Sequence, residues 1–146
     1  MGGEPQVVDL LVETAAAETL LGQYPDAHYY HHGVGLTQVD EDTFAWLREK
    51  YASGFVADCL KDRFGVAIAQ VNYRELAFSP LLAFIWCRLR YMTVPHPVPT
   101  KIKERAAYWK RFYNTVKGKG TPQEYFFRAT PAFVVDVESR SVNDDT

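Results

Sequence analysis

Residues 79–92, SPLLAFIWCRLRYM, decide the fold, because they predict a helix that is buried along most of its length. Ser79 is a preferred N-cap residue, and Pro80 suits the first helical position because its fixed φ is already helical. The stretch is apolar on nearly every side until Arg88 and Arg90. A helix that is apolar all round belongs in the interior. We therefore expect this helix to be the central one.

The sequence on either side of this helix is also mostly helical in pattern. Further helices are predicted at residues 5–22, 40–51, 55–63, 100–114 and 121–128. In the first of these, Pro5 suits the N-terminal turn and Gly22 suits the C-terminal cap. Residues 66–73 fit a strand or a helix equally well, and residues 129–146 are expected to form an extended tail. The 146-residue chain is therefore predicted to form one mainly α domain, residues 1–128, followed by this C-terminal tail.

Composition and charge exclude several classes of protein. The formal net charge of -2 excludes a uniformly basic nucleic-acid coat. The first residues, MGGEPQ, lack the basic and apolar regions of a signal peptide, and the longest apolar run, residues 81–87, is far shorter than a membrane span. Cys59 and Cys87 are too few for a disulfide framework and are expected to be small buried side chains. The sequence predicts no cofactor and no membrane segment.

Glu18 is a carboxylate in an unexpected place. At about 100° of rotation per residue, it falls on the inward face of the first predicted helix, whereas Asp9 and Glu13 fall on the opposite face, where solvated acids belong. Burial and the negative end of the helix dipole both disfavour the ionised form. We therefore expect a raised pKa for Glu18, which suits a general acid near neutral pH. The alternative is a boundary glutamate whose stem packs inside while its carboxylate reaches water. The expected inward neighbours are Leu11, Thr14, Ala15 and Leu21.

Three short motifs occur in an order that resembles a known family. They are Glu18-Thr19, Gly33-Val34-Gly35-Leu36-Thr37-Gln38 and Phe112-Tyr113-Asn114. Together they are similar to the Glu-Ser, Gly-x-Gly-Leu-Met-Gln and Tyr-Asn motifs of the lysozyme-like superfamily, in its lytic transglycosylase and goose-type lysozyme branch. The stretch from residue 108 to residue 121 also resembles small phage-encoded members. The resemblance covers residues 7–128 and implies a lysozyme-like fold, α+β with minimal β. The chain departs from the family pattern at Thr19 for Ser, Thr37 for Met and Thr115 for Ala-Gly.

The resemblance implies cleavage of the β-1,4 bond between MurNAc and GlcNAc in peptidoglycan. Glu18 would be the general acid that protonates the glycosidic oxygen. In a lytic transglycosylase the same residue then acts as a base on the C6 hydroxyl of the sugar, which gives a 1,6-anhydro product with one carboxylate. A hydrolase normally uses two carboxylates. Asp40 is the candidate for the second and Asp26 is a further one, while the alternative for Asp40 is a helix N-cap.

The remaining motif residues are expected to bind the substrate. The resemblance implies that Gln38 and the backbone of residues 33–36 line the sugar cleft, where glycines let the main chain approach closely. Tyr113 lies on the inward stripe of its helix, so its hydroxyl is expected either to bond Glu18 or to be satisfied within the core. Asn114 is expected to hold a substrate group or to end the helix. The predicted substrate-binding residues are Thr19, Gly33, Gly35, Leu36, Gln38, Tyr113 and Asn114.

Two further clusters have several interpretations. The loop before the glycine motif contains His28, His31, His32, Tyr24, Tyr29 and Tyr30. These rings are expected to stack on sugars rather than to bind a metal, because no metal-ligand spacing accompanies them. Residues 101–119 are basic, which indicates a solvated face, a nucleic-acid surface or attraction to an anionic cell-wall polymer. No nucleic-acid-binding motif is present, so we expect neither a specific nucleic acid partner nor a metal. The basic residues are Lys101, Lys103, Arg105, Lys110, Arg111, Lys117 and Lys119.

Two functions follow as hypotheses. The first is a bacteriophage virion-associated glycosidase, present in the host cytoplasm during assembly, that degrades the cell wall from the periplasm during infection. Without a signal peptide, a virion or a holin would deliver it. Phe133-Val134-Val135 in the tail would dock other virion or tail proteins by strand addition. The second is a catalytically silent structural or adaptor virion protein with the same fold, which Thr37 and Thr115 favour.

Overall fold

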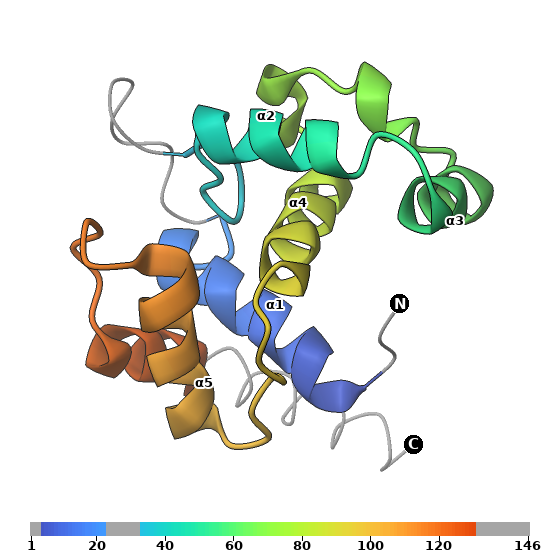
Figure 1. The fold of residues 1–146 in the computed structure, drawn as a ribbon. Helices are drawn as coiled ribbons and strands as arrows, with labels where there is room; N and C mark the ends of the chain where they lie inside the picture. The colour runs from blue at the N-terminus through green and yellow to red at the C-terminus, as the bar shows by residue number, and fades with distance from the viewer. Residues whose placement is uncertain (1–3, 23–32, 131–146) are drawn as a thin grey trace, which may run out of the picture.

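The structure is a computed structural model that describes residues 4–22 and 33–130. These residues form a mainly α-helical domain (Figure 1). An isolated antiparallel bridge between Val34 and Val39 is the β structure in the described part of the chain. The predicted mainly α class is therefore confirmed.

Most helices lie where the sequence predicts them. Residues 66–73, which fit a strand or a helix, contain a 3-10 turn and the start of another, and no strand. The elements are α1 (Pro5–Thr19), α2 (Glu41–Lys50), α3 (Phe55–Phe64), η1 (Ile68–Gln70), η2 (Tyr73–Ala77), α4 (Pro80–Met92), α5 (Ile102–Trp109), the π-helical turn η3 (Lys110–Asn114) and a last helix over residues 122–130.

Helix α4 is the central element, as predicted, and it separates two hydrophobic cores. It runs from the group formed by α2, α3 and the 3-10 turns to the group formed by α1 and α5 (Figure 1). Ile85, Trp86 and Leu89 belong to the first core, where they meet side chains from α2, α3 and both 3-10 turns. Cys87 and Tyr91 belong to the second core, with Leu10 of α1 and Tyr108 of α5.

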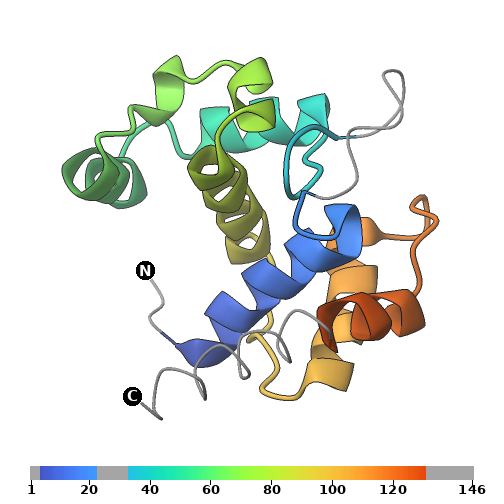
Figure 2. The same ribbon diagram turned by 180° about the vertical axis from the view of Figure 1, so that it is seen from behind.

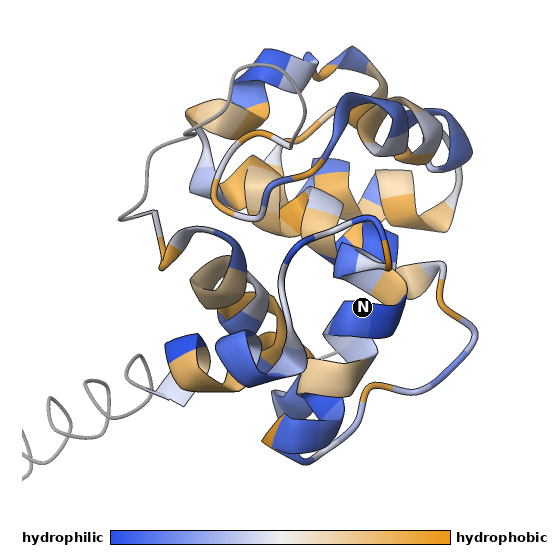
Figure 3. Cartoon of the chain, turned by 90° about the vertical axis from the view of Figure 1, so that its left-hand side faces the viewer, coloured by the Kyte–Doolittle hydropathy of each residue, from blue (hydrophilic) through white to orange (hydrophobic). Residues whose placement is uncertain are grey.

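A third cluster joins α1 to α5 and to the last helix. Its members are Ala17, Ala106, Trp109 and Tyr125. Small alanines let the helices approach closely, and the rings of Trp109 and Tyr125 lie 5.2 Å apart. Figures 1 and 2, seen from opposite sides, place the last helix beside α5. In Figure 3 the helices carry both hydrophobic and hydrophilic residues, as expected for amphipathic helices packed on a core.

The prediction that Glu13 faces solvent is wrong, because its side chain is fully buried. Arg105 Nε donates to Oε1 of Glu13 and Arg105 Nη2 donates to Oε2 at 3.0 Å. The Tyr125 hydroxyl donates to Oε1 at 3.0 Å. Arg105, predicted to belong to a basic surface stretch, is thus also buried. Helix α5 and the last helix cover the face of α1 that the sequence pattern assigns to solvent.

The boundary between domain and tail also differs from the prediction. The last helix begins with the expected capping box, because the Thr121 N–H donates to Glu124 and the Glu124 N–H donates to the Thr121 hydroxyl. The helix continues to residue 130, and Ala129 is fully buried. Residues 129 and 130 therefore belong to the domain. The predicted docking strand, residues 133–135, lies outside the described residues.

The two cysteines differ in burial. Cys87 is fully buried, as expected, whereas Cys59 is only partly buried. Within residues 4–22 and 33–130, no helix combines the length and apolarity needed to cross a membrane.

We predict that Glu13→Ala lowers the free energy of unfolding by about 3–5 kcal/mol, because it leaves the buried Arg105 guanidinium without its anionic partner. The matched control is Asp9→Ala. Asp9 lies 4.0 Å from Arg105 with its side chain 40% exposed, so its loss should cost less than about 1 kcal/mol. Urea denaturation of both variants measures the difference. Equal losses would contradict the assignment of the stabilising pair to Glu13.

Candidate active site

Glu18 is the second-last residue of α1, and its side chain is half-buried. The helix ends at Thr19, three residues before the predicted end, because Leu20 and Leu21 adopt left-handed conformations with φ of 49° and 55°. Their backbone N–H groups bond back to the last turn of α1 at 3.0 and 3.2 Å. A left-handed non-glycine residue costs roughly 1–2 kcal/mol, and such strain concentrates at functional sites. Gly22, the predicted cap, follows this reversal with φ 84°.

The hydroxyl of Thr19 joins the end of α1 to the glycine loop, residues 33–38. It lies 2.7 Å from the carbonyl oxygen of Leu36 and 3.1 Å from that of Ala15, and it accepts the Gly22 N–H at 3.0 Å. The Thr19 side chain is buried. This residue, predicted to bind substrate, therefore forms its bonds within the protein and fixes the loop beside Glu18.

The two glycines of the loop are required by the protein's own backbone. The position of a Cβ on Gly33 lies 2.0 Å from the carbonyl of Gln38, and that on Gly35 lies 2.2 Å from the carbonyl oxygen of Leu76. Gly35 also has φ 77°, which favours glycine. The N–H of Val34 donates to the carbonyl of Val39 at 3.0 Å and closes a small hairpin. The predicted approach of the main chain to a sugar is therefore not needed to explain these glycines.

Polar side chains hold this hairpin in place from inside. Gln38 has φ 54°, and its side-chain amide donates to the carbonyl of Gly35 at 2.9 Å. Thr37 is fully buried, and its hydroxyl donates to the carbonyl of Ala83 in α4 at 3.0 Å. The threonine that stands where the family pattern has Met thus anchors the loop to the central helix.

Trp109 of α5 binds the candidate acid directly. Its indole N–H donates to Oε1 of Glu18 at 3.1 Å. Burial raises the pKa of Glu18 to about 7, although hydrogen bonds from Trp109 and Asn114 and the charges of Arg128 and Lys110 lower it in part. The raised pKa that the sequence predicts is confirmed.

A π-helical turn brings the side chains of Trp109 and Asn114 to the side of the chain that faces Glu18. The predicted regular helix over residues 100–114 stops at Trp109, and in η3 the N–H of Thr115 donates to the carbonyl of Lys110 at 2.7 Å. A turn with i→i+5 hydrogen bonds places residue 114 beneath residue 109, whereas an α-helix would turn it aside. Both side chains therefore act on the pKa of Glu18.

The Gly118-Lys119-Gly120 loop packs closely against Trp109 and Asn114. The position of a Cβ on Gly118 lies 2.3 Å from Asn114 Oδ1, and that on Gly120 lies 2.5 Å from the Trp109 ring. Lys110 Nζ donates to Asn114 Oδ1 at 2.7 Å and to the carbonyl of Gly118 at 3.0 Å. Because Lys110 engages the amide oxygen, the amide nitrogen is left to donate to Glu18. The sequence analysis did not assign Trp109, Lys110 or Arg128 to the site. Gly118 and Gly120 were the available signal for Trp109 and Lys110, because these two residues contact the Gly118-Lys119-Gly120 loop.

Tyr113 does not donate to Glu18, so that prediction is wrong. Its hydroxyl donates to the carbonyl of Thr37 at 2.7 Å, which confirms the alternative of a satisfied core aromatic. The ring stacks on Tyr91 with centroids 5.1 Å apart. Burial raises the pKa of the Tyr113 hydroxyl well above its usual range, with smaller contributions from Cys87 and Glu18. Tyr113 therefore fixes η3 to the glycine loop.

Asp40 forms the predicted N-cap of α2. Its Oδ1 accepts the N–H of Thr43 and its Oδ2 accepts the Thr43 hydroxyl, each at 2.8 Å. Asp26 and the histidine–tyrosine cluster of residues 24–32 lie outside the described residues. Among the residues that are described, no group of three or more His, Cys, Asp or Glu side chains is placed to bind a metal ion.

Comparisons with protein-family models, with curated proteins and with solved structures found no match for this chain. Its chemistry therefore has to be argued from the geometry around Glu18. The carboxyl group accepts the indole N–H of Trp109 at Oε1, and it also accepts a hydrogen bond from Asn114. The arrangement supplies one carboxyl group that can donate and regain a proton near pH 7.

We predict that Thr115→Gly raises the free energy of unfolding by about 1 kcal/mol. Thr115 has φ 64° and ψ 179°, a region that essentially only glycine adopts, and relief of this strain should exceed the entropic cost of glycine. The control is Thr93→Gly at φ -78°, which should be destabilising. Thermal unfolding of both variants measures the effect, and a loss of stability in Thr115→Gly would contradict the strained conformation.

We also predict that Glu18→Gln becomes more stable than the wild type as pH rises. A carboxyl whose folded pKa is about 7 instead of 4.5 holds its proton more tightly in the folded state. The wild type then loses up to about 3 kcal/mol of stability between pH 4.5 and pH 7, a loss that the uncharged glutamine avoids. Urea denaturation at pH 4 and pH 8 measures it, with Glu41→Gln on exposed α2 as the control. A difference that stays constant with pH would refute the raised pKa.

Proposed function

We propose that this protein is a peptidoglycan-cleaving glycosidase with a lysozyme-like fold and that Glu18 is its general acid. The observation that carries the proposal is the half-buried Glu18 carboxyl, whose pKa burial raises to about 7. The mainly α fold and the order of the three motifs support the assignment, and the strained end of α1 beside Glu18 is of the kind found at functional sites. The substrate is the β-1,4 bond between MurNAc and GlcNAc.

The reaction follows from the two protonation states of Glu18. The neutral carboxyl gives its proton to the glycosidic oxygen as the bond from that oxygen to C1 breaks. The resulting carboxylate is stabilised by the N–H of Trp109, by Asn114 and by the charges of Lys110 and Arg128. It then removes the proton of the C6 hydroxyl as that oxygen attacks C1. The 1,6-anhydro sugar forms and Glu18 regains its proton, so no water is consumed.

The surroundings of Glu18 favour this route over hydrolysis with two carboxylates. The charges with the largest effects on the pKa of Glu18 are those of the cations Arg128 and Lys110, not that of a second acid. Asp40, the candidate for a second carboxylate, has both oxygens engaged by Thr43 in the N-cap of α2. A transglycosylase needs only the one carboxyl group that the described residues bring to this site.

A structural or adaptor virion protein is the second candidate function. It is favoured by the internal use of the predicted substrate-binding residues. Thr19, Gln38 and Tyr113 bond to the protein's own backbone, and Gly33 and Gly35 pack against it. In that case Glu18 is a buried acid without a substrate. Both candidates place the protein in a virion.

We predict that Glu18→Gln lowers the rate of clearing of purified peptidoglycan by about 10²–10⁴-fold, because glutamine cannot donate a proton. Asp40→Asn and Glu41→Gln are the matched carboxyl controls and should retain the wild-type rate. Mass spectrometry should find 1,6-anhydro ends, whereas reducing ends would indicate a hydrolase. If the wild type and Glu18→Gln are equally inert while both fold, the structural function is correct.

We further predict that the Trp109 indole N–H sets the alkaline limit of activity. The rate should fall as pH rises through about 7, because the acid form of Glu18 is lost. Trp109→Phe removes a donor that lowers the Glu18 pKa, so the fall should move to higher pH. The control is Trp46→Phe on the exposed side of α2, which should not move it. An unchanged pH profile in Trp109→Phe would show that Trp109 only fills space.

A further inference from the structure

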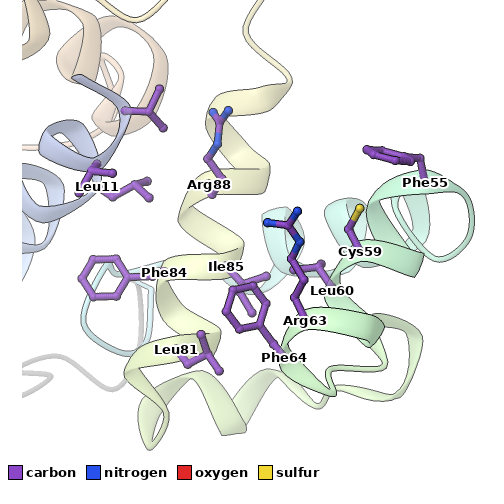
Figure 4. Close-up of a pocket in the computed structure, with 12 residues that line it drawn as sticks. Leu11, Phe55, Cys59, Leu60, Arg63, Phe64, Leu81, Phe84, Ile85 and Arg88 are labelled. Carbon is purple, nitrogen blue, oxygen red and sulfur yellow. The ribbon is translucent and has the colours of Figure 1, made fainter. Parts of the chain in front are cut away.

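A second feature lies at the N-terminal half of α1, where a cavity of about 270 Å³ opens between α1, α3 and α4. We call it the α1–α3–α4 groove, and Figure 4 shows its lining side chains. Phe55 on its rim is 74% exposed, and Val8 and Phe64 are also exposed. An apolar hollow bordered by exposed aromatic rings is typical of a binding surface. Its apolar lining includes Val8, Leu11, Phe55, Phe64, Leu81 and Phe84.

The charge of the groove is entirely positive. Arg63 of α3 and Arg88 of α4 are the charged residues of its lining (Figure 4). The Nε of Arg88 is buried and has no hydrogen-bond partner among the described residues. A buried donor without a partner costs roughly 1–3 kcal/mol, and more when it is charged. The groove is therefore complementary to an apolar segment that is followed by carboxylates.

We propose that residues 131–146 of the same chain, PAFVVDVESRSVNDDT, bind in this groove. Phe133, Val134 and Val135 match its apolar wall, and Asp136 and Glu138 follow at once to pair with its two arginines. The cavity is larger than the roughly 150 Å³ that holds a benzene ring, so it accepts the Phe133 side chain. A buried Arg–carboxylate pair would satisfy the Arg88 Nε.

The segment follows a helix that lies against α1, and α1 lines the groove. The last helix lies against α1, where Arg128 Nη1 donates to the carbonyl of Ala17 at 2.6 Å. Val8 of α1 lines the groove. It lies about 14 Å from Ala17 along the axis of α1, at a rise of 1.5 Å per residue. The sixteen residues 131–146 span roughly 53–58 Å when fully extended, which exceeds this distance along α1. The proposal is independent of the role of Glu18.

Cys59 offers a direct test in the full-length chain. It lines the groove and is partly buried, whereas Cys87 is fully buried and unreactive. Under mild oxidation, Val135→Cys should form a disulfide with Cys59 within one chain, because a disulfide needs Cα atoms within about 7 Å. Asp145→Cys, at the other end of the segment, is the matched control and should form it at least about tenfold more slowly. Mass spectrometry of peptides identifies the linked pair.

A second measurement does not depend on a new cysteine. Maleimide labelling of Cys59 should be slow in the wild type and about tenfold faster in Phe133→Ser/Asp136→Lys, which weakens docking by about 1.4 kcal/mol or more. Asp144→Lys/Asp145→Lys is the charge-matched control and should label at the wild-type rate. Equal disulfide rates at positions 135 and 145, or equal labelling in all three proteins, would overturn the proposal. A disulfide between two chains would also overturn it, because a second copy would then fill the groove.

Discussion

The burial of the Glu18 carboxyl between α1 and α5 is the constraint on which the rest of the site depends. Ionisation of a half-buried acid is costly, and that cost raises its pKa to about 7 despite a hydrogen bond from Trp109 and two nearby cations. The strained end of α1, the link from Thr19 to Leu36 and the π turn after Trp109 all serve to hold this position. Together with burial, these contacts give Glu18 a pKa close to neutral pH.

The central helix and the inward position of Glu18 could be predicted from sequence because each depends on a local pattern. The apolar run of α4, its Ser79 cap and the Asp40 cap are set by residues within a few positions of one another. Glu13 could not be predicted, because its partner Arg105 lies 92 residues away. Helical periodicity shows which face of a helix is polar, but it does not show that another polar helix covers that face.

The details of the site depended on tertiary contacts in the same way. Helix α1 stops at Thr19 because Leu20 and Leu21 adopt left-handed conformations, which residues of this type rarely do and which the sequence between residues 5 and 22 does not signal. The end of α1 and the glycine loop meet through the bond from Thr19 to Leu36, and the motifs did not show that Tyr113 bonds Thr37 instead of Glu18. The π turn, which brings Asn114 under Trp109, carries no periodic signal of its own.

The proposed chemistry therefore depends on one property of the molecule, which is a Glu18 pKa raised by burial to about 7. Its most direct test is a ¹³C NMR titration of side-chain-labelled glutamate in the intact protein, with the Glu18 signal identified by its absence in Glu18→Gln. Burial of the carboxyl predicts a midpoint at about 7. A midpoint near the ordinary value of 4.5 would contradict it and would leave Glu18 as an ionised surface acid without the chemistry proposed for it.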